Sequence, residues 1–123
     1  MYSTEFFRRN ADTVSQSLSP GEILFREGDE AAEMFVLLEG IADIAVGKRV
    51  VETAMPGAMI GEMALIDNSP RAATVTAKTQ CRLAKIDLER FQQLVKQDPM
   101  FAVQVMKALV GRVRNINRML AEA

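Results

Sequence analysis

The sequence contains no histidine among its 123 residues, and this absence excludes several classes of active site. Histidine-based metal centres, Ser-His and Cys-His nucleophile pairs and imidazole acid-base catalysis all require that side chain. We therefore expect no metal, no catalytic residue and no enzymatic activity. A small barrel enzyme of the cupin type, which depends on a histidine-rich metal centre, is the least favoured interpretation.

Cysteine and long hydrophobic runs are equally scarce. The lone Cys81 excludes an intramolecular disulfide, and its alternating apolar surroundings favour a small buried hydrophobe over a reactive thiol. The N-terminus lacks an apolar core of signal-peptide length, and no run of uncharged apolar residues is long enough to span a membrane. These features predict a cytoplasmic location, where thiols stay reduced.

Excess charge of one sign is also absent. The chain has 15 basic and 16 acidic residues, a formal net charge of -1, so no overall field attracts nucleic acid or anionic membranes. A basic strip formed by Lys107, Arg114 and Arg118 is better explained as a solvated helix face than as a nucleic-acid site. Composition and length suit one soluble globular domain over residues 1–123, with 49% hydrophobic residues to form a core.

Short apolar or alternating segments separated by turn residues occupy residues 12–86. This pattern is typical of an all-β sandwich or barrel. The expected strands are "EILF", "MFVLLE", "IADIAV", "RVVETAM", "AATVTA" at residues 72–77 and "CRLAKI" at residues 81–86.

The pattern changes after the last of these strands. Asp87 can cap a helix over residues 87–96, whose apolar residues recur at helical spacing. Asp98, followed by Pro99, can cap a second and longer helix over residues 98–122.

The longer helix carries an apolar seam with alternating spacings of four and three residues. Its members are Ala102, Met106, Leu109, Val113, Ile116 and Leu120. Such a seam resembles that of a coiled coil and favours a two-helix dimer interface. The alternative is that the whole stripe packs on the chain's own barrel.

The stretch "GEMALIDNSPRAATV", residues 61–75, contains the parts of an anion site. A helical turn beginning at Glu62 leaves its first amides without intrahelical partners, and such helix starts bind anions. Arg71 offers a guanidinium that suits two phosphate oxygens. Ala72 and Ala73 add two backbone amides with almost no side chain in the way.

The acidic residue of this stretch has a different role, because two anions repel. The carboxylate of Glu62 can instead accept a hydrogen bond from a sugar hydroxyl, so the whole stretch suits a ribose phosphate. The alternative, on the residues alone, is a structural ion pair of Arg71 with Glu62 or Asp67 over a turn.

The order Gly-Glu-x-Ala-Leu, a short polar turn and Pro-Arg-Ala-Ala-Thr-Val resembles the phosphate-binding cassette of cyclic nucleotide-binding domains. We call residues 61–75 the cassette. The resemblance extends to the glycine-punctuated strands before the cassette. From Arg71 onward, the sequence most resembles effector domains of the bacterial catabolite activator type, also called the cyclic-AMP receptor type. It implies a mainly β fold with flanking helices: a jelly-roll (double-stranded β-helix) barrel, a short helix and a long C-terminal helix.

The resemblance also implies roles for individual residues. Glu62 would bind the ribose 2'-hydroxyl, Arg71 the cyclic phosphate, and backbone amides near Ala64, Ala72 and Ala73 the phosphate oxygens. The full set of implied ligand-binding residues is Gly61, Glu62, Met63, Ala64, Arg71, Ala72, Ala73 and Asn117.

The same resemblance bears on the base. Members that prefer cyclic GMP tend to have threonine after the cassette arginine, so Ala72 favours cyclic AMP over cyclic GMP. The two positions of the long helix that contact adenine in the activator type are Ile116 and Asn117 here. Asn117 can hydrogen-bond a base edge, whereas Ile116 can only pack against it.

The favoured function is a stand-alone cyclic-AMP sensor that signals through its C-terminal helix to a partner or dimer mate. One alternative is a nucleotide-free dimerisation or scaffold module with a degenerate site. Another is an effector-domain fragment of a larger transcription factor, channel or kinase. The sequence stops where the activator type continues into its helix-turn-helix, so we expect no DNA-binding domain in this chain.

Overall fold

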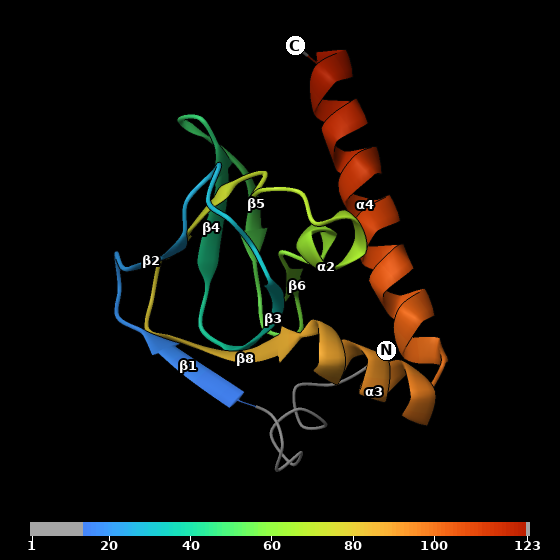
Figure 1. Cartoon of the computed structure of the whole chain (residues 1–123). Coiled ribbons are helices and arrows are strands. Elements are labelled where there is room, and N and C mark those ends of the chain that lie inside the picture. The colour runs from blue at the N-terminus through green and yellow to red at the C-terminus, as the bar shows by residue number, and fades with distance from the viewer. Residues whose placement is uncertain (1–13, 123) are drawn as a thin grey trace.

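The computed structural model describes residues 14–122 and contains two antiparallel four-stranded sheets that face each other (Figure 1). One sheet has the order β1 (Val14–Leu18), β8 (Cys81–Asp87), β3 (Glu33–Glu39) and β6 (Met59–Ile60). The other has the order β2 (Ile23–Phe25), β7 (Thr74–Ala77), β4 (Ala42–Val46) and β5 (Arg49–Ala54). The predicted fold class, mainly β with flanking helices, is confirmed.

Two strands were not anticipated one by one from the sequence. Strand β1 pairs with β8 over its whole length, and β6 pairs with the middle of β3 through two residues only. A two-residue strand is too short to display alternation, so only its partner reveals it. The predicted barrel start at residue 12 lies outside the described residues, as does the N-terminal segment in which no leader was expected.

Strand β3 is buried on both faces, which explains its continuous apolar sequence. Phe35 and Leu37 point into the core between the two sheets. Met34, Val36 and Leu38 alternate with them and belong to a second core, which the helices cover. The barrel and the helices are therefore joined through one shared strand.

Both C-terminal helices are capped by the predicted aspartates, although the longer one begins at Met100 rather than at residue 98. The Asp87 side chain accepts a hydrogen bond of 2.8 Å from the amide of Arg90 and caps α3 (Leu88–Gln97). The Asp98 side chain accepts one of 3.0 Å from the first amide of α4 (Met100–Glu122). Neither these helices nor the short α2 (Met63–Asp67) of the cassette has the length and apolarity needed to cross a membrane.

Helix α4 contacts the barrel from Phe101 to Asn115 and extends past it at the C-terminal end (Figure 1). Phe101 and Val105 are its fully buried residues. The predicted seam is one residue out of phase with this buried face. Its members Met106, Val113, Ile116 and Leu120 are exposed, and only Ala102 and Leu109 are half-buried. The alternative in which the whole stripe packs on the chain's own barrel is therefore wrong.

Candidate ligand-binding site

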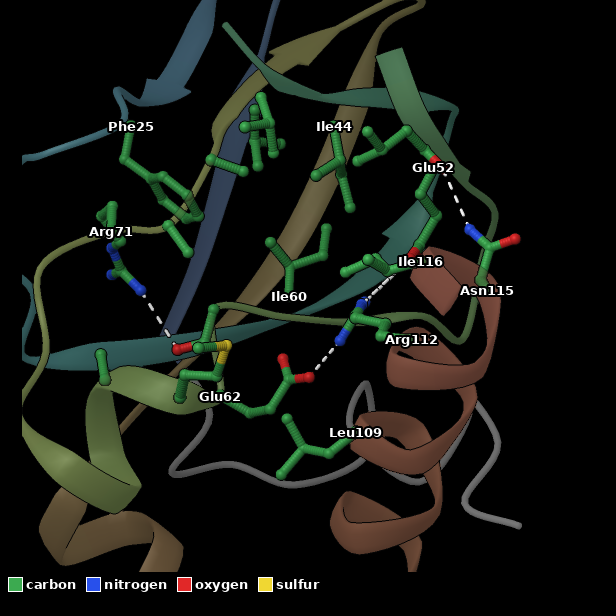
Figure 2. Close-up of a pocket in the computed structure, with 18 of the residues that line it drawn as sticks. Phe25, Ile44, Glu52, Ile60, Glu62, Arg71, Leu109, Arg112, Asn115 and Ile116 are labelled. Carbon is green, nitrogen blue, oxygen red and sulfur yellow. Dashed lines mark hydrogen bonds and ion pairs between the residues drawn. The ribbon is translucent and has the colours of Figure 1, made fainter. Parts of the chain in front are cut away.

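A cavity of about 270 Å³ lies between the second sheet, the cassette and α4 (Figure 2). Most of the residues expected at the site line it, namely Gly61, Glu62, Met63, Ala64, Arg71, Ala72 and Ala73. Asn117 does not, because it lies on the exposed side of α4. Ile116, the other α4 position singled out from the sequence, does line the cavity.

The cassette opens with a glycine at a position where any other residue would be strained. Gly61 has φ +75°, in the left-handed region, and a Cβ at this position would overlap Nη1 of Arg71. The tight turn leads into α2 (Met63–Asp67), with Glu62 at its N-cap position. The helix begins one residue later than predicted, and the Glu62 side chain does not cap it but is free to turn toward the cavity.

We expect Gly61→Ala to destabilise the fold by about 1–2 kcal/mol, from backbone strain together with displacement of the arginine. Gly111→Ala is the matched control, because Gly111 is helical and its added Cβ would meet open space. That change should stabilise the protein by about 0.5–1 kcal/mol through helix propensity. Urea unfolding followed by circular dichroism measures both. Equal effects of the two changes would contradict the close approach at Gly61.

Arg71 is fixed from two directions. Its amide donates to the carbonyl of Asp29 at 2.9 Å, and its carbonyl accepts from the amide of Gly28 at 2.8 Å. Its guanidinium donates through Nη1 to the carbonyl of Gly61 at 3.2 Å and through Nη2 to that of Glu33 at 2.7 Å. The loop after β2 therefore positions the backbone, and the cassette and β3 position the charge.

The Arg71 guanidinium also lies over the ring of Phe25, with Cζ 4.0 Å from the ring centroid. Only 6% of the residue is exposed, and its buried Nε has no hydrogen-bond partner in the described part of the chain. Burial lowers the pKa of Arg71, while the charges of Glu33 and Asp29 oppose that shift. An arginine nevertheless stays protonated at neutral pH, so the cavity has a buried cation with a donor to spare.

The structural ion pair considered from the sequence is not formed. Among the described residues, Arg71 makes no ion pair with Glu62 or Asp67. Its Nη1 and Nη2 atoms instead donate hydrogen bonds to backbone carbonyls. A carbonyl is neutral, so the positive charge at this end of the cavity is not cancelled by a direct contact. That charge can attract an anion.

Glu62 is paired with an arginine from α4 that the sequence analysis did not single out. Glu62 is 2% exposed, and its Oε1 accepts a hydrogen bond from Nη1 of Arg112. Arg112 also donates to both carboxylate oxygens of Glu52 on β5, at 3.0 and 3.2 Å, and to the carbonyl of Met59. Burial disfavours its charge, but hydrogen bonds to Glu52 and the charge of Glu62 hold the pKa of Arg112 above its ordinary value.

The spacing of Arg112 is a signal only once the buried face of α4 is known from the structure. Phe101, Val105, Ala108 and Arg112 follow one another at spacings of four, three and four residues, so the arginine lies on the apolar face of α4. A lone charge on a buried helix face requires a partner. Asn115, three residues on, was missed as well; it lines the cavity and donates to the carbonyl of Val51 at 3.2 Å.

The end of the cavity farthest from Arg71 contains the polar side chains of Glu52, Arg112 and Asn115 (Figure 2). The apolar lining of the cavity comes largely from β4, β5 and α4 and includes Ile44, Val46, Val51, Val113 and Ile116. A flat apolar group fits between such walls. The cavity can thus hold an anion at one end, a hydroxyl-bearing group beside Glu62 and a ring system at the other end.

One expectation about the cassette is only partly met. The amide of Ala64, expected to be free for phosphate oxygens, donates to the carbonyl of Gly61 at 3.4 Å, and that of Leu65 donates to the carbonyl of Glu62 at 3.2 Å. The first of these is a long hydrogen bond, which a stronger acceptor can replace. Ala72 and Ala73 meet the cavity with nothing larger than a methyl group.

Comparison with known proteins gives the same picture of the chain. The sequence profile of the cyclic nucleotide-binding domain family matches residues 15–98. A cAMP-dependent protein kinase regulatory subunit of Eremothecium gossypii is 37% identical over 78 residues, which are 63% of this chain and 17% of that protein. A type II regulatory subunit of Drosophila melanogaster is 30% identical over 80 residues, 65% of this chain and 21% of that protein. The chain thus spans about a fifth of the length of these curated relatives.

Solved structures agree. The structure of cAMP-bound PfPKA-R has a TM-score of 0.76 and 30% identity, covering 87% of this chain and 37% of its own. A structure described with a cyclic-GMP-dependent signalling pathway that regulates bacterial phytopathogenesis has a TM-score of 0.77 and 28% identity. The match covers 94% of this chain and 95% of that chain. The Thermus thermophilus catabolite activator protein, at 23% identity and a TM-score of 0.78 over 89% of this chain and 54% of its own, shares the fold.

Proposed function

The chain belongs to the cyclic nucleotide-binding domain family, and on that premise we propose that its cavity binds cyclic AMP as the input of a regulatory switch. The observation that carries the proposal is Arg71, a buried cation at the cavity wall that has no carboxylate partner and an unused Nε donor within residues 14–122. Such a cation is costly to bury and gains most from an anionic ligand.

The proposed pose follows the three parts of the cavity. The cyclic phosphate lies at Arg71 and at the backbone of Ala72 and Ala73. The ribose 2'-hydroxyl donates to Glu62, whose carboxylate has lone pairs left beside its bond to Arg112. The base lies between the apolar walls of the barrel and α4. Asn117 is exposed and does not line the cavity, so it has no part in this pose.

Two observations favour cyclic AMP over cyclic GMP. The residue after the cassette arginine is Ala72, which has no hydroxyl for a guanine edge. The relatives reported above include cAMP-dependent kinase regulatory subunits and a cAMP-bound structure. These relatives are regulatory proteins, and we propose a regulatory rather than catalytic role for this chain, in the cytoplasm, where its lone buried Cys81 stays reduced.

Helix α4 is the proposed output element. Leu109, Val113 and Ile116 line the cavity, and the same three residues belong to the predicted dimer seam. A ligand shifts a conformational equilibrium only through contacts that differ between the two states. Contacts of the base with these residues would therefore alter the position of the surface that meets a partner or dimer mate.

Isothermal titration calorimetry with cyclic AMP tests the proposal, with cyclic GMP and 5'-AMP as competitors. We expect saturable binding near one per chain, with a dissociation constant of order 10 μM or tighter. This estimate assigns roughly -0.3 kcal/mol to each of about 22 heavy atoms. Absence of binding by all three at several temperatures, with fluorescence competition also negative, would favour the scaffold alternative.

The proposed dimer has a separate test. Leu120 is 69% exposed at the end of the seam, so Leu120→Glu should shift a self-associating protein toward the monomer by placing a charge in the interface. Val14→Glu on β1, where the side chain is 61% exposed, is the matched control and should leave the mass unchanged. Light scattering after gel filtration, over a range of concentrations, gives the result. A wild-type monomer throughout that range would argue for a different partner on α4.

A further inference from the structure

We propose that Glu52 reads the base, by accepting a hydrogen bond from the exocyclic amino group of adenine. This inference rests on the proposed function, since it needs a cyclic nucleotide in the cavity. It adds a specificity-determining residue on β5, in a part of the chain where no site residue was predicted. Glu52 lines the cavity and is one of its few polar side chains away from the cassette.

The position of Glu52 follows from a continuous series of contacts. Arg71 bonds to the carbonyl of Gly61, Glu62 is the next residue, Glu62 pairs with Arg112, and Arg112 pairs with Glu52. Figure 2 shows the same order across the cavity, with Arg71 at one end and Glu52 at the other. A cyclic nucleotide has the order phosphate, ribose, base. With its phosphate at Arg71 and its ribose at Glu62, its base extends toward Glu52.

The end of the cavity that contains Glu52 has one more carboxylate than it has cations. Glu52 and Glu62 share the single guanidinium of Arg112, so the three side chains carry a net negative charge. Each oxygen of Glu52 accepts one hydrogen bond from Arg112, and a carboxylate oxygen has two lone pairs. Glu52 can therefore accept another hydrogen bond without releasing Arg112.

The other polar groups nearby are already engaged as donors. Arg112 donates to Glu52, Glu62 and the carbonyl of Met59, and the amide nitrogen of Asn115 donates to the carbonyl of Val51. What this end offers a base is consequently an acceptor with negative charge. Such a group attracts the amino group of adenine, in the way that acidic side chains accept from base amino groups, and repels a carbonyl oxygen at the same ring position.

Cyclic IMP is the decisive probe, because hypoxanthine has an oxygen where adenine has the amino group. We expect the wild-type protein to bind cyclic AMP about tenfold or more tightly than cyclic IMP, the size of one good side-chain contact to a base. Glu52→Gln keeps the shape and can also donate to that oxygen. It should bring the two affinities within about threefold of each other, mainly by improving the binding of cyclic IMP.

Asp43→Asn on β4 is the matched control. It neutralises one carboxylate of the same sheet, which accepts from Thr53 and does not line the cavity, so the preference for cyclic AMP should remain. A second probe needs no variant. Cyclic purine riboside monophosphate has only hydrogen in place of the amino group and should bind wild-type protein about tenfold more weakly than cyclic AMP.

The outcomes separate the two proposals. Equal binding of cyclic AMP, cyclic IMP and the unsubstituted purine would overturn the role of Glu52 and leave cyclic nucleotide binding intact. Equal weakening of all three ligands by Glu52→Gln would also overturn it, because that result marks a residue that only positions Arg112. Absence of binding by every cyclic nucleotide would remove the proposed function and this inference together.

Discussion

Arg71→Ala is expected to weaken cyclic AMP binding by more than ~2 kcal/mol, about 30-fold in the dissociation constant. The substitution removes a charge-assisted contact to the phosphate and the only cation that the cassette contributes to the cavity. Titration calorimetry measures the loss directly. Cyclic AMP and cyclic GMP should lose affinity to the same extent, since both present the same phosphate.

The arginine is buried, so the folded state must be checked in the same samples. Arg71→Lys retains the charge but cannot contact two phosphate oxygens at once, and it should give an intermediate loss. Arg82→Ala is the matched control, because Arg82 is exposed on β8 outside the cavity lining. An unchanged titration for a folded Arg71→Ala protein would mean that the ligand binds elsewhere.

Glu62→Gln is expected to abolish the preference for ribose over 2'-deoxyribose cyclic nucleotides. A hydrogen bond to a charged acceptor contributes about 1.5–3 kcal/mol, so wild-type protein should bind cyclic AMP at least about tenfold more tightly than 2'-deoxy cyclic AMP. The variant retains the shape of the side chain but not its charge. Its two affinities should lie within about threefold of each other in competition titrations.

The ratio of the affinities for cyclic AMP and 2'-deoxy cyclic AMP is more informative than either affinity alone, because the substitution has a second effect. Glu62 pairs with Arg112, so neutralising it also weakens the connection between the cassette and α4. That effect applies to both ligands and cancels in their ratio. Glu89→Gln, on the exposed side of α3, removes the same charge away from the cavity and should leave the ratio unchanged. Equal losses for the two ligands would exclude the 2'-hydroxyl as the partner of Glu62.

Predictions from the sequence were most accurate where the signal is local. The caps at Asp87 and Asp98 depend on a side chain and an amide a few residues away, and both are formed. The cassette is likewise a single stretch, and its helical turn begins within one residue of the predicted start. The strand β6 shows the opposite case, since its two residues form a strand only because β3 pairs with them.

The limits of helix α4 were predictable from the sequence, whereas its buried face was not. The reason is that two apolar stripes lie one residue apart on it. Packing against Met34, Val36 and Leu38 selected the stripe of Phe101 and Val105 and left most of the predicted seam exposed. The selected stripe is the one whose Phe101 and Val105 join the buried cluster shared by the barrel and the helices.

The sequence by itself determined the β-rich barrel, the two capped helices and a cassette that contains Glu62 and Arg71, because each depends on spacing within a short segment. Only the tertiary structure decided that Arg112 and Glu52, fifty and ten residues from Glu62, meet it at one cavity. Ion pairs between distant segments leave no periodic pattern in a sequence. They form because a carboxylate buried to 2% exposure requires a cation, and the packing of α4 supplies one.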